Sequence, residues 1–598
     1  MTTDPNSAPP TGSPSGAPSR APSRRRVLAG AAGAGFAVAA GVRQGAHAAD
    51  LPPLGTYDVV VIGSGAAGMT AALTAAGQGM SCVVLEKAPT FGGSAARSGA
   101  GIWIPNNPVL LAAGVPDTPA KAAAYLAAVV GPDIPADRQR AFLAHGPATI
   151  SYVMAHSPLR FRWMEGYSDY YPELPGGLPN GRSIEPDQLD GRILGPELAR
   201  LNPPYMGVPA GMVVFSADYK WVTLAAVNAK GAAVAAQCLA RGTAAALRGE
   251  KPLTMGQSLA AGLRAGLRSA GVPVWLNTPL TDLHVENGTV TGAVVTRDGA
   301  PGLVRARRGV IVGSGGFEHN AAMRARFQRQ PIGTDWTVGA KENTGDGILA
   351  GERLGAALDL MDDAWWGPAI PVPGQPYFCL AERTLPGGLL VDGSGRRFVN
   401  EAAPYSDVVH TMYDAPEAIP SWLITDQNYR NRYLFKDVLP TLPLPAAWYD
   451  SGAAHKAWSL DALAASIGVP AAALRTTVDR FNSQARRGED PDFHRGDSAY
   501  DHYYTDPSVL PNSCLAPLWL PPYHAFRIVP GDLGTKGGLL TDARARVLRE
   551  DGSVIPGLYA AGNASAAVMG HSYAGAGSTI GPAMTFGYIA ARDIAGTL

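Results

Sequence analysis

The sequence has no excess of charge and few cysteines. Its 598 residues contain 49 Lys and Arg and 49 Asp and Glu, so the formal net charge is zero. No overall field would gather nucleic acid or an anionic surface, and we predict no nucleic-acid partner. The four cysteines, Cys82, Cys238, Cys379 and Cys514, form no CxxC, CxxCH or zinc-ligand spacing. This excludes covalent c-type haem, argues against a disulfide framework and leads us to predict no metal site.

A long apolar run is also missing. The apolar stretch over residues 27–42 is short and rich in Ala and Gly, which makes it too weakly hydrophobic for a membrane span. It follows Ser23-Arg24-Arg25-Arg26 and leads to an AxA-type cleavage site at Ala46-His47-Ala48. Residues 1–48 therefore resemble a disordered region with a twin-arginine signal peptide, and a plain disordered tail is the alternative.

The twin-arginine route carries folded proteins, which suits a chain that loads a cofactor before it leaves the cytoplasm. We therefore predict export by this route to the periplasm or cell envelope, where peripheral association with a membrane stays open. Without a functional signal, the protein would be cytoplasmic.

What the sequence does contain is a dinucleotide-binding frame. With 46% hydrophobic residues, the chain is long enough for two or more domains. Tyr57–Ile62 is a β-branched run typical of a buried parallel strand, and Gly63-Ser64-Gly65-Ala66-Ala67-Gly68 follows it directly. In this pattern the first glycine allows a tight turn, the second lets a pyrophosphate approach the backbone, and the third lets a helix over Ala66–Gln78 pack closely. A second strand, Cys82–Leu85, ends at Glu86, where a carboxylate would bind the adenosine ribose.

Later segments extend this frame. The stretch 91–101 is rich in small residues and suits a backbone lying against a flat ring. Residues 285–290 predict a hairpin with an Asn287-Gly288 turn, followed by a strand at 309–312 and the turn Gly313–Gly316. This second turn lacks the third glycine, which disfavours a separate NAD site. A similar frame returns at 557–563, so one nucleotide domain is assembled from distant pieces of the chain.

The order of these motifs, with Asn343-Thr344-Gly345-Asp346-Gly347 between them, resembles the fumarate reductase and succinate dehydrogenase flavoprotein superfamily over residues 56–598. The resemblance implies FAD as cofactor and an α/β fold, in which a Rossmann-type FAD-binding domain carries an inserted α+β catalytic cap domain. It implies that FAD is held by Gly63, Ser64, Gly65, Ala66, Ala67, Gly68, Glu86, Lys87, Gly93, Ser94, Ser98, Gly99, Ala100, Gly101, Ser314, Gly315, Asp346, Gly562, Asn563, Thr579 and Ile580.

The domain boundaries follow from changes in composition. Aromatic residues and prolines interrupt the pattern at 363–368, and small residues resume it at 535–538. We therefore expect the FAD-binding domain over 56–363 and 535–598 and the cap over 364–534, with helices at 460–467 and 471–486. Residues 172–216, rich in Gly and Pro, are expected to form long surface loops.

The C-terminal segment 569–581 contains no arginine. Superfamily members that reduce fumarate carry one there to bind a carboxylate, whereas this chain offers the hydroxyl of Tyr573 and the backbone of Gly577. Both donate hydrogen bonds without requiring a full negative charge. This favours a ketone as substrate.

Together with Tyr167–Glu173, Arg397–Tyr405 and Asp532–Gly538, this segment resembles the 3-ketosteroid Δ1-dehydrogenases. The resemblance implies that Tyr405 is the base that takes a proton from steroid carbon 2 and that FAD accepts the hydride from carbon 1. It also implies that Tyr573 and the Gly577 amide bind the 3-keto oxygen. A hydrogen bond from Tyr170 would favour the Tyr405 phenolate.

Several points stay open. Tyr167 and Tyr171 are alternatives for the role of Tyr170, and Ala574 stands where the family often has proline. His571 is a possible proton carrier, although a structural role is favoured. The alternatives to the Δ1-dehydrogenase function are a Δ4(5α)-ketosteroid dehydrogenase, a fumarate reductase-like enzyme and a non-catalytic flavin- or steroid-binding protein. We predict a quinone as electron acceptor, since an exported chain without haem must pass electrons to something outside itself.

Overall fold

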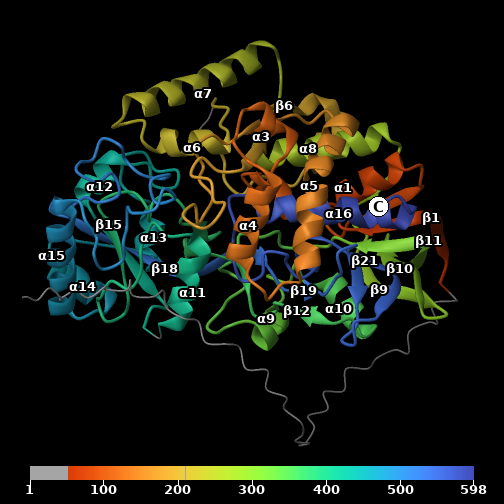
Figure 1. Cartoon of the computed structure of the whole chain (residues 1–598). Coiled ribbons are helices and arrows are strands. Elements are labelled where there is room, and N and C mark those ends of the chain that lie inside the picture. The colour runs from red at the N-terminus through yellow and green to blue at the C-terminus, as the bar shows by residue number, and fades with distance from the viewer. Residues whose placement is uncertain (1–50, 209–210, 416) are drawn as a thin grey trace, which may run out of the picture. The chain divides into compact units, whose positions relative to one another are not determined.

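Two large β-sheets organise the protein. The computed structural model describes residues 51–208, 211–415 and 417–598, and the predicted export signal lies outside these residues. Both sheets belong to one unit of the chain, residues 48–598, and Figure 1 labels several of their strands. No helix in the described part of the chain has the length and apolar character needed to cross a membrane. The four cysteines are all buried and free.

The first sheet is the nucleotide-binding sheet predicted from the sequence. Its strand order is β20-β21-β11-β1-β2-β8, and the β9–β10 hairpin pairs with β11. β1 lies parallel to both β2 and β11. The strands of this sheet are β1 (Pro53–Ile62), β2 (Cys82–Leu85), β8 (Val274–Trp275), β9 (Leu280–Glu286), β10 (Thr289–Arg297), β11 (Ala300–Val312), β20 (Arg546–Leu548) and β21 (Val554–Ala560).

Local sequence determines these elements. The four residues at the end of β1, Val59–Ile62, are fully or almost fully buried, as expected for a central parallel strand. Asn287 and Gly288, the two residues between β9 and β10, have φ angles of 50° and 76°, which a two-residue hairpin of type I′ requires. The predicted strand, helix, strand and hairpin are therefore confirmed, and the predicted helix ends one residue early, at Gly77.

Helices cover the first sheet. α1 (Ala66–Gly77) packs against α16 (Ile580–Ala595) and α8 (Met255–Ser269), and α16 also contacts α5 (Ala136–His156). α1 and α16 lie side by side in Figure 1. The C-terminal helix therefore completes the domain that begins with β1.

The second sheet is antiparallel. Its strand order is β14-β13-β18-β16-β15, and β17 also pairs with β18. The predicted cap helices are confirmed as α14 (Leu460–Ile467) and α15 (Ala471–Arg487), whose apolar residues form a core with β15 and β16. The domain boundaries themselves stay a prediction. The strands are β13 (Ala364–Ile370), β14 (Tyr377–Phe378), β15 (Gly388–Val391), β16 (Ser421–Asp426), β17 (Ala454–Ala457) and β18 (Tyr523–Thr535).

The prediction of surface loops over 172–216 is wrong for part of this range. β5 (Ser183–Pro186) is fully buried between β3 and β4, and η2 (Gly191–Arg200) is a helical segment. The buried Glu185 carboxylate accepts hydrogen bonds from the backbone of Ser216 and Ala217. These tertiary contacts stabilise a short strand that a count of Gly and Pro cannot reveal.

The remaining strands form three smaller sheets, β3-β5-β4, β12-β19 and β6-β7. The shorter strands are β3 (Ile102–Trp103), β4 (Phe161–Trp163), β6 (Leu189–Asp190), β7 (Pro252–Leu253), β12 (Leu358–Asp359) and β19 (Gly538–Leu539). The helical elements are α2 (Gly93–Arg97), α3 (Pro108–Ala112), α4 (Pro119–Val130), α6 (Ser216–Thr223), α7 (Ala229–Leu247), α9 (Ala321–Phe327), α10 (Asp346–Arg353), α11 (Tyr405–Asp414), α12 (Gln427–Arg432), α13 (Ala446–Asp450) and η3 (Gly562–Ala564).

Candidate active site

A cavity of about 630 Å³ joins the nucleotide-binding frame to a group of buried tyrosines, a size typical of ligand sites. The four predicted catalytic residues line it: Tyr170, Tyr405, Tyr573 and Gly577. So do all the predicted cofactor residues except Gly68: Gly63, Ser64, Gly65, Ala66, Ala67, Glu86, Lys87, Gly93, Ser94, Ser98, Gly99, Ala100, Gly101, Ser314, Gly315, Asp346, Gly562, Asn563, Thr579 and Ile580.

The turn between β1 and α1 has the form of a phosphate-binding loop. Gly63 has a φ of 96°, and an added Cβ would lie 2.4 Å from the Gly313 carbonyl oxygen. Gly68 packs against the Gly63 carbonyl, which explains why it lies behind the cavity wall. Among the residues that the structure describes, no group accepts a hydrogen bond from the backbone N–H of Gly65, Ala66 or Ala67. Unpaired N–H groups at a helix N-terminus bind anions, so this turn fits the pyrophosphate of FAD.

Glu86 supports this turn. Its carboxylate accepts hydrogen bonds from the Ser64 N–H at 2.9 Å, the Ser64 hydroxyl at 2.6 Å and the Ala88 N–H at 2.8 Å. Burial raises the pKa of Glu86, and these three donors oppose the shift. The carboxylate therefore holds the glycine turn in place, while its contact with the ribose stays a prediction. Next to it, Lys87 forms a 2.8 Å ion pair with Asp346 across the cavity wall.

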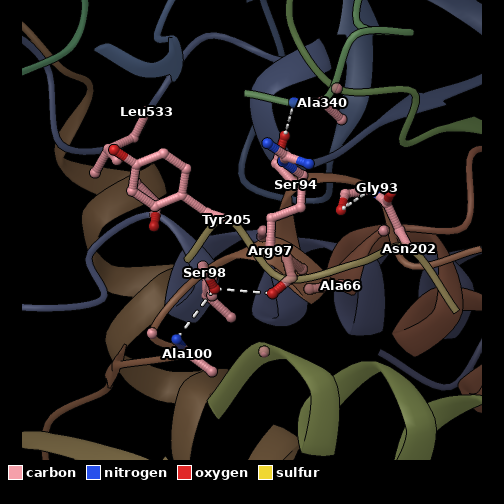
Figure 2. Close-up of a pocket in the computed structure, with 18 of the residues that line it drawn as sticks. Ala66, Gly93, Ser94, Arg97, Ser98, Ala100, Asn202, Tyr205, Ala340 and Leu533 are labelled. Carbon is pink, nitrogen blue, oxygen red and sulfur yellow. Dashed lines mark hydrogen bonds between the residues drawn. The ribbon is translucent and has the colours of Figure 1, made fainter. Parts of the chain in front are cut away.

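The segment 93–101 forms another wall, as Figure 2 shows. The Ser94 hydroxyl accepts a hydrogen bond from the Ala340 N–H at 2.9 Å, and Ser98 caps the Ala100 N–H at 3.0 Å. The Asn202 side chain donates to the Gly93 carbonyl at 3.0 Å. These bonds fix the small residues of this segment as a rigid surface, which fits a flat flavin ring.

The tyrosines form one buried cluster. The Tyr170 hydroxyl donates to the Tyr405 hydroxyl at 2.9 Å. The Tyr573 ring centroid lies 5.1 Å from that of Tyr405 and 5.2 Å from that of Tyr170. Tyr405 begins α11, whereas Tyr573 belongs to the loop before α16. Residues far apart in the sequence thus bring three hydroxyl-bearing rings to one end of the cavity.

Burial controls the acidity of this cluster. It raises the pKa of Tyr405 well above 10, and the hydrogen bond from Tyr170 lowers it. Burial also raises the pKa of Tyr573, while a hydrogen bond with Tyr405 opposes that shift. The Tyr170 bond therefore acts in the expected direction, but burial outweighs it and keeps the Tyr405 phenol as the resting form.

The neighbouring tyrosines have other partners. The Tyr171 hydroxyl donates to Asp407 at 2.9 Å, and the Tyr167 ring stacks on Tyr503 with centroids 3.9 Å apart. The hydrogen bond to Tyr405 comes from Tyr170. This geometry favours Tyr170 over the two alternatives.

Gly577 lies against the backbone of the segment 93–101. Its φ is 97°, and an added Cβ would lie 2.2 Å from the Gly101 carbonyl group. Within the described ranges, its N–H has no hydrogen-bond acceptor, so it can donate to a ligand. Ala574, the departure from the family pattern, accepts hydrogen bonds at its carbonyl from the Tyr170 N–H and the Tyr125 hydroxyl. The loop is therefore anchored without proline.

Other residues that line the cavity were not predicted from the sequence. Tyr205 and Leu533, both visible in Figure 2, line it together with Tyr219, Phe378 and Tyr504. They come from α6, from strands β14 and β18 of the second sheet and from loops, and no motif marks them. Arg97 is the one arginine among the described residues that line the cavity. It belongs to α2 and not to the segment around Tyr573.

Known proteins are similar to this chain in sequence and in fold. The family model of the FAD binding domain matches residues 58–580. The 3-oxosteroid 1-dehydrogenase of Mycolicibacterium smegmatis is 54% identical over 554 residues, which cover 90% of this chain and 97% of that protein. The 3-oxosteroid 1-dehydrogenase of Comamonas testosteroni is 33% identical, with 90% of this chain and 96% of that protein covered.

The crystal structure of 3-ketosteroid Δ1-dehydrogenase from Sterolibacterium denitrificans, in complex with 1,4-androstadiene-3,17-dione, matches with a TM-score of 0.87. It is 41% identical, and the match covers 91% of this chain and 100% of that chain. The predicted fold and the predicted cofactor are thus confirmed. The chain binds FAD and belongs to the 3-oxosteroid 1-dehydrogenase family.

Proposed function

We propose that this protein is an FAD-dependent dehydrogenase that introduces a double bond between carbons 1 and 2 of 3-ketosteroids. The observation that carries the proposal is the cluster of Tyr170, Tyr405 and Tyr573, which lines the same cavity as the FAD-binding turn. The 54% identity to a 3-oxosteroid 1-dehydrogenase supports the steroid as substrate class.

Two species must leave the substrate. The ketone acidifies the hydrogen on carbon 2 but not the hydrogen on carbon 1, so the first departs as a proton and the second as a hydride. When bound, FAD supplies the hydride acceptor. Tyr405 first releases its own proton to the solvent, and the phenolate so formed accepts the proton from carbon 2. The Tyr170 hydroxyl, 2.9 Å away, donates a hydrogen bond that stabilises this phenolate.

The developing enolate needs donors at the ketone oxygen. Tyr573 and Gly577 both line the cavity, and in the described part of the chain no group accepts a hydrogen bond from the Gly577 N–H. One such donor contributes about 3 kcal/mol to the stability of an oxyanionic transition state. Since neither donor carries a full positive charge, the pair suits a neutral ketone better than a carboxylate.

The cavity wall suits an apolar substrate. Phe378 packs edge-on against the Tyr405 ring with centroids 5.3 Å apart, and Leu533 lies in the same wall. A flat steroid placed on these side chains would exclude water from the tyrosines, which strengthens the hydrogen bonds made there.

Anaerobic titration with 4-androstene-3,17-dione tests the proposal. The bound flavin should lose its visible absorbance, and mass spectrometry should find a product lighter by two hydrogens with a 1,4-dien-3-one ultraviolet spectrum. Succinate in a parallel titration should leave the flavin oxidised. Flavin that stays oxidised with the steroid, or bleaches with succinate, would reject the proposal. We also propose a quinone as electron acceptor, to be tested by mixing the reduced protein with a soluble quinone.

A further inference from the structure

A buried carboxylate outside the cavity joins the segments that carry the tyrosines. Asp363, whose side chain is 3% exposed, precedes β13. Its carboxylate lies 2.9 Å from His410 Nε2, 3.2 Å from His571 Nδ1 and 3.2 Å from Lys536 Nζ. The Trp366 indole N–H also donates to it. One carboxylate thus contacts donor groups from four positions in the chain.

Two of these donors lie close in sequence to the predicted catalytic residues. His410 lies in α11, the helix that begins at Tyr405. It follows Tyr405 by five residues, which places it about 7.5 Å farther along the helix axis and on a different face of the helix. His571 precedes Tyr573 by two residues. Asp363 therefore contacts both the helix that carries Tyr405 and the segment that carries Tyr573, and it does not line the cavity itself.

Lys536 strengthens the link to Tyr573. Its ammonium group donates to the Ser572 carbonyl at 3.0 Å, directly before Tyr573. It also lies 4.9 Å from the centroid of the Trp365 ring, and Trp365 packs edge-on against the Tyr573 ring at 5.1 Å. The Lys536 side chain is fully buried, so it requires an anionic partner, and Asp363 is the carboxylate paired with it.

The charges around Asp363 favour its ionised form, which can accept hydrogen bonds from all of these donors. Burial alone would raise the pKa of Asp363, but Lys536, His410 and His571 reverse the effect and hold it well below the usual range. The hydrogen bond to Asp363 raises the pKa of His571. The carboxylate is thus ionised and can hold all its donors at once.

We propose that Asp363 is a positioning residue that fixes α11 against the segment before α16, and so sets the separation between the hydroxyl groups of Tyr405 and Tyr573. The inference rests on the proposed function, in which these hydroxyls act on neighbouring atoms of one steroid. The distance between the base, Tyr405, and the donor to the ketone oxygen, Tyr573, must then stay constant. A misplacement of about 1 Å can lower an enzymatic rate by about 100-fold.

Asp363→Asn tests the inference with the FAD-loaded protein. We expect the rate constant of anaerobic flavin reduction by saturating 4-androstene-3,17-dione to fall by about 10- to 100-fold. The FAD content and the steroid dissociation constant, measured from the change in flavin absorbance, should change far less. Asp506→Asn is the matched control, because Asp506 is equally buried and accepts hydrogen bonds from Arg432 and Tyr433. It should lower the melting temperature and leave the reduction rate unchanged.

Histidine variants keep the test valid if Asp363→Asn does not fold. The amide nitrogen of Asn replaces a histidine Nδ1 and that of Gln replaces Nε2, so His571→Asn and His410→Gln should retain the wild-type rate. His571→Ala and His410→Leu remove the donors and should lower it. If the last two bind FAD and are reduced as fast as the wild type, the inference is overturned. If the wild type itself is not reduced by the steroid, the proposed function fails first.

Discussion

The Tyr170 hydroxyl donates a 2.9 Å hydrogen bond to the Tyr405 hydroxyl, although 235 positions separate the two residues in the chain. This bond marks Tyr405 as the candidate base. Tyr405→Phe removes the proton-accepting oxygen and should lower the rate of steroid-dependent flavin reduction by about 100- to 10,000-fold, the usual contribution of a general base. Stopped-flow absorbance under anaerobic conditions measures this rate.

The variant should still bind FAD, because Tyr405 lies outside the phosphate-binding turn. Tyr433→Phe is a suitable control, since it removes a buried hydroxyl that donates to Asp506 rather than to the cluster. A Tyr405→Phe protein reduced at the wild-type rate would exclude Tyr405 as the base.

Tyr170→Phe should change the pH dependence rather than abolish the reaction. The Tyr170 hydrogen bond lowers the pKa of Tyr405 against the opposing effect of burial. Its loss disfavours the phenolate, so the Tyr405 pKa rises and the ascending limb of the rate profile moves to higher pH. Flavin reduction measured across a pH series would show this shift. An unchanged profile would mean that Tyr170 does not act on the base.

Sequence patterns predicted the elements that depend on local chemistry. The β1 strand, the GxGxxG turn and the β9–β10 hairpin were visible because period, glycine placement and turn type are encoded in adjacent residues. The cap helices α14 and α15 followed from apolar spacing in the same way. Strand β5 was missed, because its burial comes from partners elsewhere in the chain.

The site was predictable only in part. Motifs identified the cofactor, while the tyrosines were singled out through the family resemblance, because nothing in a lone Tyr marks it as catalytic. The distance between Tyr170 and Tyr405 depends on how α11 packs, which is a tertiary property. The same is true of Asp363, whose donors come from three further segments and show no common motif.

The export prediction can be tested without structural information. The double variant Arg24→Lys/Arg25→Lys keeps the charge of the segment but removes the twin-arginine pair. We expect the wild type in the periplasm or cell envelope and the variant in the cytoplasm with its FAD bound. Cell fractionation followed by immunoblotting and flavin fluorescence measures both. Equal distribution of the two proteins would show that residues 1–48 do not act as a twin-arginine signal.

Tyr573→Phe removes one donor from the ketone oxygen. Because such a donor acts mainly on the transition state, we expect kcat/KM for 4-androstene-3,17-dione to fall by about 100-fold. The ring contacts with Tyr405 and Tyr170 remain, so the fold should be retained. Steady-state assays with an artificial electron acceptor provide the measurement. A change confined to KM would show that Tyr573 contributes only to ground-state binding.

Gly65 allows the pyrophosphate site to be tested separately from the fold. Its φ is −71°, and an added Cβ would meet no protein atom within 4 Å, so the Gly65→Ala apoprotein should melt at or slightly above the wild-type temperature. The methyl group would instead occupy the space in which the pyrophosphate approaches the backbone.

We therefore expect the dissociation constant for FAD to rise by about tenfold or more, equivalent to about 1.4 kcal/mol. Gly63→Ala provides the contrast, since its Cβ would collide with the Gly313 carbonyl at 2.4 Å and should destabilise the apoprotein itself. Circular dichroism melting and quenching of flavin fluorescence distinguish the two effects. If Gly65→Ala binds FAD as tightly as the wild type, the pyrophosphate does not lie against this residue, and the unpaired N–H groups of the turn need another ligand.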